Sequence, residues 1–188
     1  ASADARFNRA TKGLYEMGST FKVLNTAIAL ETGAADINQR FDVGKPMRIS
    51  RFTITDYKPR VRPLNVPEIM VYSSNIGSAR IAEAIGADTQ RAYMDKLGLL
   101  DRLPLQLPET SKPLSPKTWR RTTTATVSYG HGISISMVHL ASAIAAAAGT
   151  GHWIAPTLIK PKTGEAPMAM RVFSNSTTRA VRSMMRLV

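Results

Sequence analysis

Ser19 and Lys22 stand three residues apart at the start of an apolar run, and their side chains are those of a nucleophile and a base. Residues i and i+3 of a helix share a face, so the hydroxyl and the amine can meet. A lysine can activate a serine if burial lowers the pKa of its amine. A helix N-cap at Ser19 and a solvated Lys22 also fit this common pattern, so the pair alone is only a candidate.

Two further polar segments could join this pair. Tyr-Ser-Ser-Asn at 72–75 interrupts a helical pattern, and Gly-His-Gly at 130–132 precedes an apolar one. Ser73 and Ser74 could instead cap the helix that follows, and Asn75 could complete a turn. The residue types therefore allow a catalytic cluster or ordinary helix caps.

The periodicity of apolar residues predicts the elements that must position these side chains. We expect helices over 19–31, after Val66, and over 76–85, 89–97 and 137–148. Gly33, Gly86, Gly98 and Gly149 are the expected helix ends. Residues 41–62 alternate as in a hairpin or extended loop, and proline-rich 103–119 reads as loop.

The last segment predicts a helix capped by Ser176 or Thr177. The apolar positions of this predicted helix extend to the last residue, Val188, and the chain does not begin with methionine. We therefore expect a cut or processed piece of a longer protein.

Composition narrows the class of protein. The 188 residues, 44% of them hydrophobic, suit one domain, and without cysteine there are no disulfides or thiolate metal sites. No run is long enough to cross a bilayer, no signal peptide opens the chain, and no three ligands have metal-site spacing. We expect neither a metal nor a cofactor.

The net charge of +12 favours anionic partners. The basic residues are densest over 48–62, with Phe52 and Tyr57 interleaved, as in some proteins that bind single-stranded nucleic acid. A solvated hairpin explains the same stretch, and we expect no nucleic-acid partner. A basic helical nucleic-acid-binding or scaffold module remains an alternative.

Taken together, the order and spacing of 19–22, 72–75 and 130–132 resemble the class B penicillin-binding proteins. The septal peptidoglycan transpeptidases of cell division are the most similar group in that class. The likeness covers nearly the whole chain and includes flanking segments at 5–11, 15–18, 74–77, 97–99, 107–109 and 127–132.

This resemblance implies a role for each motif residue. Ser19 would attack the carbonyl between two D-alanines of a stem peptide, and Lys22 would accept its proton. Ser73 would relay a proton to the leaving amine, and Asn75 would hold the substrate backbone and position Lys22. Additional substrate-binding residues would be Ser74, Gly130, His131 and Gly132. β-Lactams would acylate the same serine.

The family's third motif is Lys-Thr-Gly on a sheet strand. Lys162, Thr163 and Gly164 have these letters, but they precede the last helix and lie between Pro161 and Pro167. We interpret them as a chance match in a surface loop. The chain is then mainly α: residues 1–188 form the helical part of the α/β transpeptidase fold, and the genuine motif and most sheet strands are absent.

The missing strand would also supply an oxyanion-hole donor, so we expect weak or no activity from the chain alone. Helices that normally cover a sheet would keep exposed apolar faces, so we expect self-association. The resemblance further implies a bacterial inner-membrane protein with a periplasmic catalytic domain. Its partners would be stem peptides, the lipid-linked precursor and membrane proteins of the divisome.

A serine β-lactamase is the enzymatic alternative, because it shares the fold and the Ser-Thr-Phe-Lys letters. The class A hydrolases also need a glutamate in a Glu-x-x-Leu-Asn setting, which is not found here. Glu109 follows Pro108 and lacks that context. The class with a carbamylated lysine usually has a branched aliphatic residue where Asn75 stands.

Overall fold

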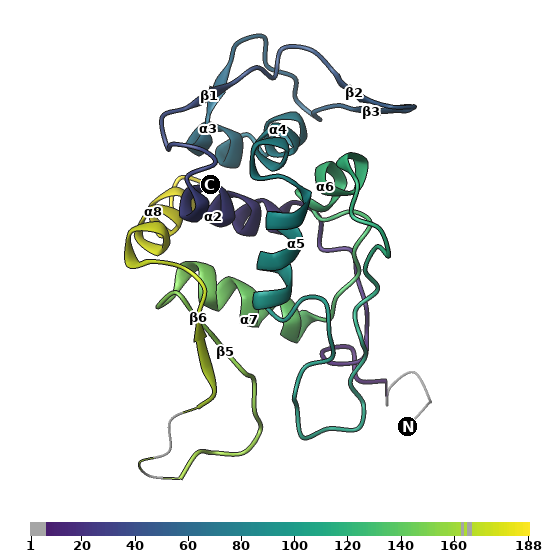
Figure 1. The fold of residues 1–188 in the computed structure, drawn as a ribbon, viewed down its shortest axis with the longest axis vertical. Coiled ribbons are helices and arrows are strands. Elements are labelled where there is room, and N and C mark those ends of the chain that lie inside the picture. The colour runs from purple at the N-terminus through teal and green to yellow at the C-terminus, as the bar shows by residue number, and fades with distance from the viewer. Residues whose placement is uncertain (1–6, 163, 165–166) are drawn as a thin grey trace.

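The structure is a computed structural model that describes residues 7–162, 164 and 167–188 (Figure 1). The helices are the 3-10 turn η1 (Gly18–Thr20), α2 (Phe21–Thr32), α3 (Val66–Val71), α4 (Asn75–Ile85), α5 (Ala87–Lys96), α6 (Arg121–Val127), α7 (Met137–Ala148) and α8 (Asn175–Met185). The strands are β1 (Arg40–Phe41), β2 (Met47–Ile49), β3 (Phe52–Ile54), β4 (Leu64–Asn65), β5 (His152–Ile154) and β6 (Ala169–Arg171). In these described ranges the strands pair only two by two, all antiparallel: β1 with β4, β2 with β3, and β5 with β6.

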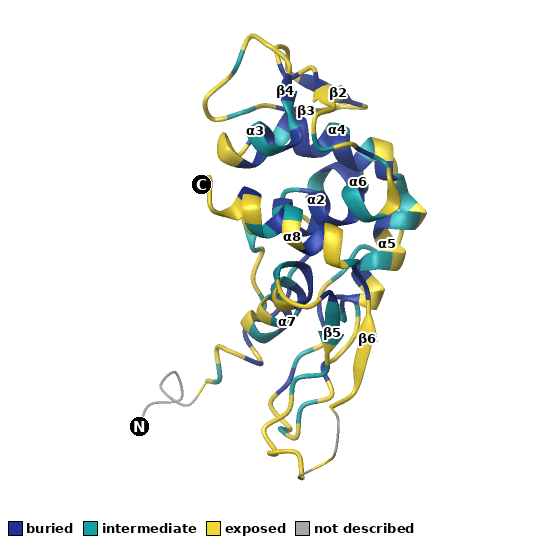
Figure 2. Cartoon of the chain, turned by 90° about the vertical axis from the view of Figure 1, so that its left-hand side faces the viewer, coloured by how far each residue is buried: buried dark blue, intermediate teal, exposed yellow. Residues whose placement is uncertain are grey.

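Helix α2 lies at the centre of the molecule. It packs against α4, α7 and α8, and its colouring in Figure 2 is mainly that of buried residues. Phe21, Leu24, Ala27 and Ile28 are fully buried because apolar residues surround this helix on nearly every side. The predicted buried helix is confirmed, and its end at Gly33 has the expected left-handed backbone with φ +69°.

The start of this helix differs in detail from the prediction. Ser19 lies in η1, and the α-helix proper begins at Phe21. Thr20, at the N-cap, makes no side-chain capping bond there. Ser19 is therefore not used as a helix cap, and its hydroxyl is available for other contacts.

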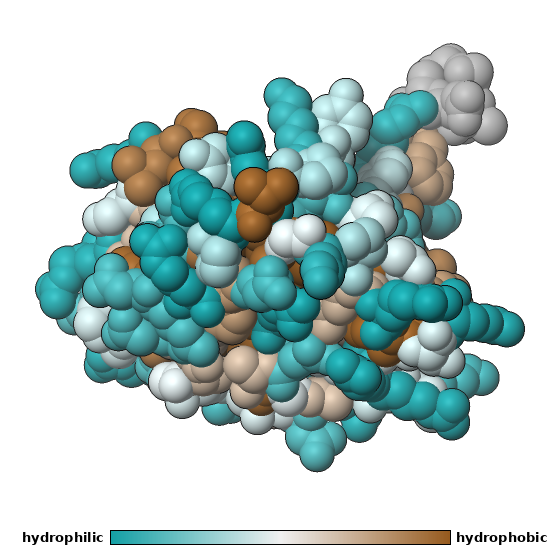
Figure 3. Space-filling view, turned by 90° about the horizontal axis from the view of Figure 1, so that it is seen from above, coloured by the Kyte–Doolittle hydropathy of each residue, from teal (hydrophilic) through white to brown (hydrophobic). Residues whose placement is uncertain are grey.

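The segment from β1 to β4 covers α3 and α4 at the top of Figure 1. Its β2–β3 pair confirms the predicted hairpin, with Met47 opposite Ile54 and Ile49 opposite Phe52. Seen from above, this face is mostly hydrophilic with separate hydrophobic side chains (Figure 3), as expected for the basic 48–62 stretch.

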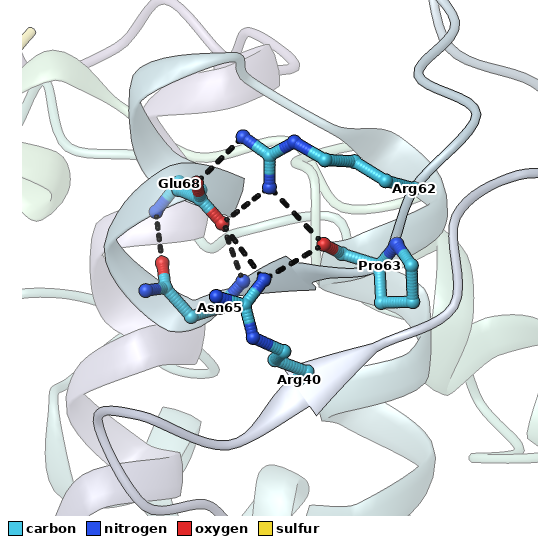
Figure 4. Close-up of polar contacts among 5 residues, drawn as sticks. All are labelled: Arg40, Arg62, Pro63, Asn65 and Glu68. Carbon is cyan, nitrogen blue, oxygen red and sulfur yellow. Dashed lines mark hydrogen bonds and ion pairs between the residues drawn. The ribbon is translucent and has the colours of Figure 1, made fainter.

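A polar cluster fixes the junction between this segment and α3 (Figure 4). The Asn65 side chain accepts a hydrogen bond from the Glu68 amide, and the Glu68 carboxylate accepts one from the Asn65 amide, both at 3.0 Å. This capping box begins α3. Arg62 adds a bidentate pair to Glu68, at 2.7 and 3.1 Å, which lowers the pKa of that carboxyl to about 2. The start of the short helix before Ser73 is thereby fixed.

Four features differ from the sequence predictions. Helix α6 and the β5–β6 pair were not expected, because α6 is short and rich in threonine and the strands have three residues each. The last helix is capped by Ser174 rather than by Ser176 or Thr177, since the Ser174 hydroxyl accepts the Thr177 amide. That helix ends at Met185, so its apolar stripe does not continue to Val188.

Loop 103–119 is without helix, as its prolines predict. His139 is a satisfied core residue, bonded to Ser136 and to the Asp101 carbonyl, and burial lowers the pKa of its ring. No helix within the described ranges is both long and apolar enough to cross a membrane.

Candidate active site

The amine of Lys22 is the centre of a polar cluster that joins two distant parts of the chain. Its Nζ lies 3.0 Å from the Ser19 hydroxyl oxygen, 2.9 Å from the Ser73 hydroxyl oxygen and 2.8 Å from Asn75 Oδ1. It also donates to the Ser73 carbonyl at 2.7 Å. The two serine hydroxyls lie 3.0 Å from each other. All four residues predicted as catalytic are thus in one cluster.

The helices bring these groups together at the end of α3 and the start of α4. Helix α3 ends in a Schellman motif, in which the amides of Ser73 and Ser74 donate to Met70 and Ile69. That motif needs a left-handed residue, and Ser73 adopts φ +51°. This strained backbone turns both the carbonyl and the hydroxyl of Ser73 toward Lys22.

Burial sets the protonation of Lys22. The residue is only 4% exposed, and desolvation lowers the pKa of its amine to about 8, although the negative charge of Asp56 opposes the shift. The carbonyls of Ser73 and Asn75 can only accept hydrogen bonds, so they hold two protons of the amine. A neutral amine therefore has its lone pair left for a serine hydroxyl, as a general base requires.

The amide of Asn75 is fixed from the other side. Its Nδ2 donates to the carbonyl of Thr55, at the end of the β2–β3 hairpin, at 3.2 Å. This bond orients the side chain so that Oδ1 faces Lys22. The hairpin is thus part of the site, a contact that the sequence did not predict.

Ser74 is placed differently from the other predicted residues. It is 2% exposed, its hydroxyl donates to Asp56 at 2.6 Å, and it accepts the Gly77 amide at 2.9 Å as the N-cap of α4. Its side chain does not contact the Lys22 amine. Its hydroxyl begins the helix, which is the alternative that the sequence also allowed, and its contact with substrate stays a prediction.

The Gly-His-Gly segment lies beside Ser19. The Gly18 amide donates to the Gly130 carbonyl at 3.3 Å. Glu16 contacts the next two residues: it accepts the Gly132 amide at 2.7 Å and lies 3.2 Å from His131 Nδ1. His131 is exposed, so the segment forms a rim next to the cluster. Glu16 was not identified from the sequence, because its partners lie more than a hundred residues away.

A buried polar chain behind the site was also not predicted. The Asn25 side chain donates to the carbonyl and hydroxyl of Ser78, at 3.0 and 3.2 Å, and that hydroxyl donates to the Ser128 carbonyl at 2.9 Å. These bonds connect α2 to α4 and to the end of α6. They hold the two helices that carry Lys22 and Asn75 in a fixed relation.

The Lys-Thr-Gly letters lie elsewhere. Lys162 and Gly164 are exposed in the connection between β5 and β6, at the opposite end of Figure 1 from α3 and α4. Thr163 lies outside the described residues. The loop placement agrees with the interpretation of this triplet as a chance match. In the part of the chain that is described, no group of three His, Asp or Glu side chains could hold a metal ion.

The strain at Ser73 gives a testable prediction. Ser73→Ala and Ser73→Gly both remove the hydroxyl, but only glycine adopts a left-handed backbone without strain. We expect the glycine variant to be more stable than the alanine variant by about 1 kcal/mol. Urea unfolding measures the difference; equal stabilities would contradict a strained Schellman residue.

Comparison with known proteins shows the family to which the chain belongs. The family model of the penicillin binding protein transpeptidase domain matches residues 2–188. A Caulobacter vibrioides relative named probable peptidoglycan D,D-transpeptidase FtsI is 39% identical over 186 residues, covering 99% of this chain and 32% of that protein. The chain thus spans about a third of the length of such curated relatives.

Two solved structures are also similar. The apo TP domain of penicillin-binding protein 3 from Burkholderia pseudomallei superposes with a TM-score of 0.90 at 31% identity, over 98% of this chain and 56% of that one. Penicillin binding protein 3 from Mycobacterium tuberculosis, in complex with aztreonam, gives 0.86 at 26% identity, over 95% of this chain and 42% of that one. With the family model matched from residue 2 to the last residue, this chain belongs to the penicillin-binding protein transpeptidase family.

Proposed function

We propose that this chain carries the nucleophile and the base of a peptidoglycan D,D-transpeptidase that acts in septal cell-wall synthesis. The observation that supports this most is the Lys22 amine, which lies within 3.0 Å of Ser19, Ser73 and Asn75. The names of the curated relatives agree with this reaction.

In the proposed acylation, neutral Lys22 takes the proton of the Ser19 hydroxyl as its oxygen attacks the penultimate D-alanine carbonyl. The bond between the two D-alanines breaks. The proton passes from Lys22 through the Ser73 hydroxyl, 2.9 Å away, to the leaving amine. The terminal D-alanine departs, and an ester on Ser19 remains.

In the second half, the amine of another stem peptide attacks this ester. Its proton returns by the same path to Ser19, and a new peptide bond forms the crosslink. A β-lactam would acylate Ser19 in place of the stem peptide, and one relative's structure is a complex with aztreonam. Asn75 donates one Nδ2 hydrogen to the Thr55 carbonyl, and the other Nδ2 hydrogen would bind the substrate backbone.

The domain and the parent protein in which this reaction takes place are also inferred. We infer that residues 1–188 are a partial transpeptidase domain, since they cover 56% of the TP-domain structure they match. We further propose a parent protein in the bacterial inner membrane with a periplasmic catalytic domain, lipid-linked precursor as substrate and divisome partners. The isolated chain is expected to self-associate through apolar helix faces that a sheet would otherwise cover. It is also expected to react slowly, because losing one oxyanion donor costs ~10²–10³ in rate.

Covalent labelling tests the function. The chain is incubated for hours with a fluorescent penicillin, and the adduct is located by peptide mass spectrometry. We expect slow labelling confined to Ser19, while Thr20, the adjacent hydroxyl that donates to Met17, stays unmodified. Label on serines other than Ser19 would refute the proposed nucleophile. Brisk labelling would contradict the expected slow rate, and rapid turnover of a chromogenic cephalosporin would favour a β-lactamase.

The pH dependence of labelling follows from the Lys22 amine. Its pKa is lowered to about 8, so the amine is mostly protonated and inactive as a base below that pH. We expect the labelling rate to rise with pH through a midpoint near 8 and then to level off. A rate that is constant between pH 6.5 and 9 would exclude Lys22 as the base.

A further inference from the structure

Asp56 connects the β2–β3 hairpin to the segment that carries Ser73 and Asn75. Its carboxylate accepts two hydrogen bonds, from the Ser74 hydroxyl at 2.6 Å and from the Ile76 amide at 3.0 Å. These two partners stand on either side of Asn75. The preceding residue, Thr55, binds Asn75 itself through its carbonyl. Two consecutive residues that follow β3 therefore bind three consecutive residues at the start of α4, with Asn75 in the middle.

Two physical effects make the hydrogen bonds of the Asp56 carboxylate favourable. Ile76 is in the first turn of α4, where amides lack partners within the helix and a negative charge is stabilised. Hydrogen bonds to an ionised acceptor are also stronger than neutral ones. A hairpin residue 20 positions earlier thus contributes to the start of a helix that already has Ser74 as its N-cap.

Asp56 also acts on Lys22 by charge. Among the described residues, it is the one charged side chain that shifts the pKa of the Lys22 amine, and it acts against the effect of burial. The other acidic residues on elements that contact α2 are Glu68, paired with Arg62, Glu83, paired with Arg121, and Asp88 and Asp95 of α5. Burial and the opposing charge of Asp56 are the causes of the shift in the pKa of the Lys22 amine.

We propose that Asp56 is a positioning residue for the Ser19 site: it holds the Ser73–Asn75 turn against the hairpin and is the fixed counter-charge of the Lys22 amine. The part of this role that concerns catalysis rests on the proposed function. The hydrogen bonds by which Asp56 holds the turn, and its charge effect on Lys22, are both present without substrate. They are therefore measurable without any reaction.

The charge is tested with Asp56→Asn, which is isosteric and keeps an acceptor for the Ile76 amide. The pKa of Lys22 is measured in the 188-residue chain by NMR titration of its side chain, assigned with Lys22→Arg. We expect the variant to lower that pKa by roughly half a unit or more, because an opposite charge is removed. Asp42→Asn is the matched control: Asp42 lies in the same segment and accepts the Gly44 amide, so no change is expected.

The hold is tested by hydrogen exchange of the Ile76 amide in Asp56→Ala. Loss of a bond to a charged acceptor should speed this exchange roughly tenfold, whereas Asp42→Ala should leave it unchanged. If Asp56→Ala does not fold, Asp56→Ser replaces it under the same criterion.

An unchanged or raised Lys22 pKa in Asp56→Asn would overturn the counter-charge, and unchanged Ile76 exchange would overturn the hold. Penicillin labelling of the same samples separates this inference from the proposed function. If the label falls on serines other than Ser19 while both physical effects are found, the proposed function fails and the positioning role stands.

Discussion

Replacing Lys22 with methionine lowers the rate of Ser19 labelling by roughly 10²–10⁴-fold, the range that general-base catalysis contributes. Methionine fills the space of the lysine stem but cannot accept a proton. Ser19 stays in place in η1, with its hydroxyl 3.0 Å from that of Ser73, yet neither hydroxyl is a base at neutral pH. The measurement is the initial rate of penicillin adduct formation by intact mass.

Lys22→Arg is the informative control for this variant. Arginine keeps the positive charge and the hydrogen-bond donors toward Ser73 and Asn75, but its guanidinium is not deprotonated in proteins. If the neutral amine is the base, arginine is as slow as methionine. A rate near that of the wild type in Lys22→Arg would show that Lys22 acts by its charge alone. Circular dichroism confirms that each variant is folded before its rate is used.

The second large effect is expected at Gly130, and it concerns stability as well as the site. This residue has φ +81°, and a Cβ added there would overlap the backbone of Gly18, the residue before Ser19. Backbone cannot move aside as a flexible side chain can. We expect Gly130→Ala to lower the free energy of unfolding by about 3 kcal/mol, from left-handed strain and overpacking together.

Gly33→Ala separates the two causes. Gly33 also has a left-handed backbone, φ +69°, but no atom lies within 4 Å of its added Cβ. Its cost should be near 1 kcal/mol, from strain alone. Urea unfolding gives both values. Equal costs would mean that the close approach of Gly130 to Gly18 is not what fixes the Ser19 turn.

The local parts of the site were predictable from the sequence. Ser19 and Lys22 are three residues apart, and one helical turn fixes where such neighbours point. Gly33 ends α2 as expected, because a left-handed C-cap is a local property of the chain. The order of the three motifs was enough to indicate the family, which the match over residues 2–188 shows.

Local patterns in the sequence left some other parts of the structure undecided and misplaced others. Ser74 is next to two residues of the cluster and resembles them chemically, but its hydroxyl begins α4. Whether a serine at a helix start faces its own helix or a neighbouring one depends on backbone angles, which the Schellman end of α3 sets here. The cap of α8 was placed two or three residues late for a related reason, since several hydroxyl residues in a row can each begin a helix.

What the sequence determined by itself is the set of chemical groups and their order: a hydroxyl and an amine on one turn, a second hydroxyl with an amide, and the apolar helices that carry them. Only the tertiary structure decided the distances at which Lys22 meets Ser73 and Asn75, more than fifty residues away. It alone decided that Asp56 and Thr55 bind the start of α4. The reason is physical. Contacts between distant segments depend on how whole helices pack, and the same packing removes water from the Lys22 amine and lowers its pKa.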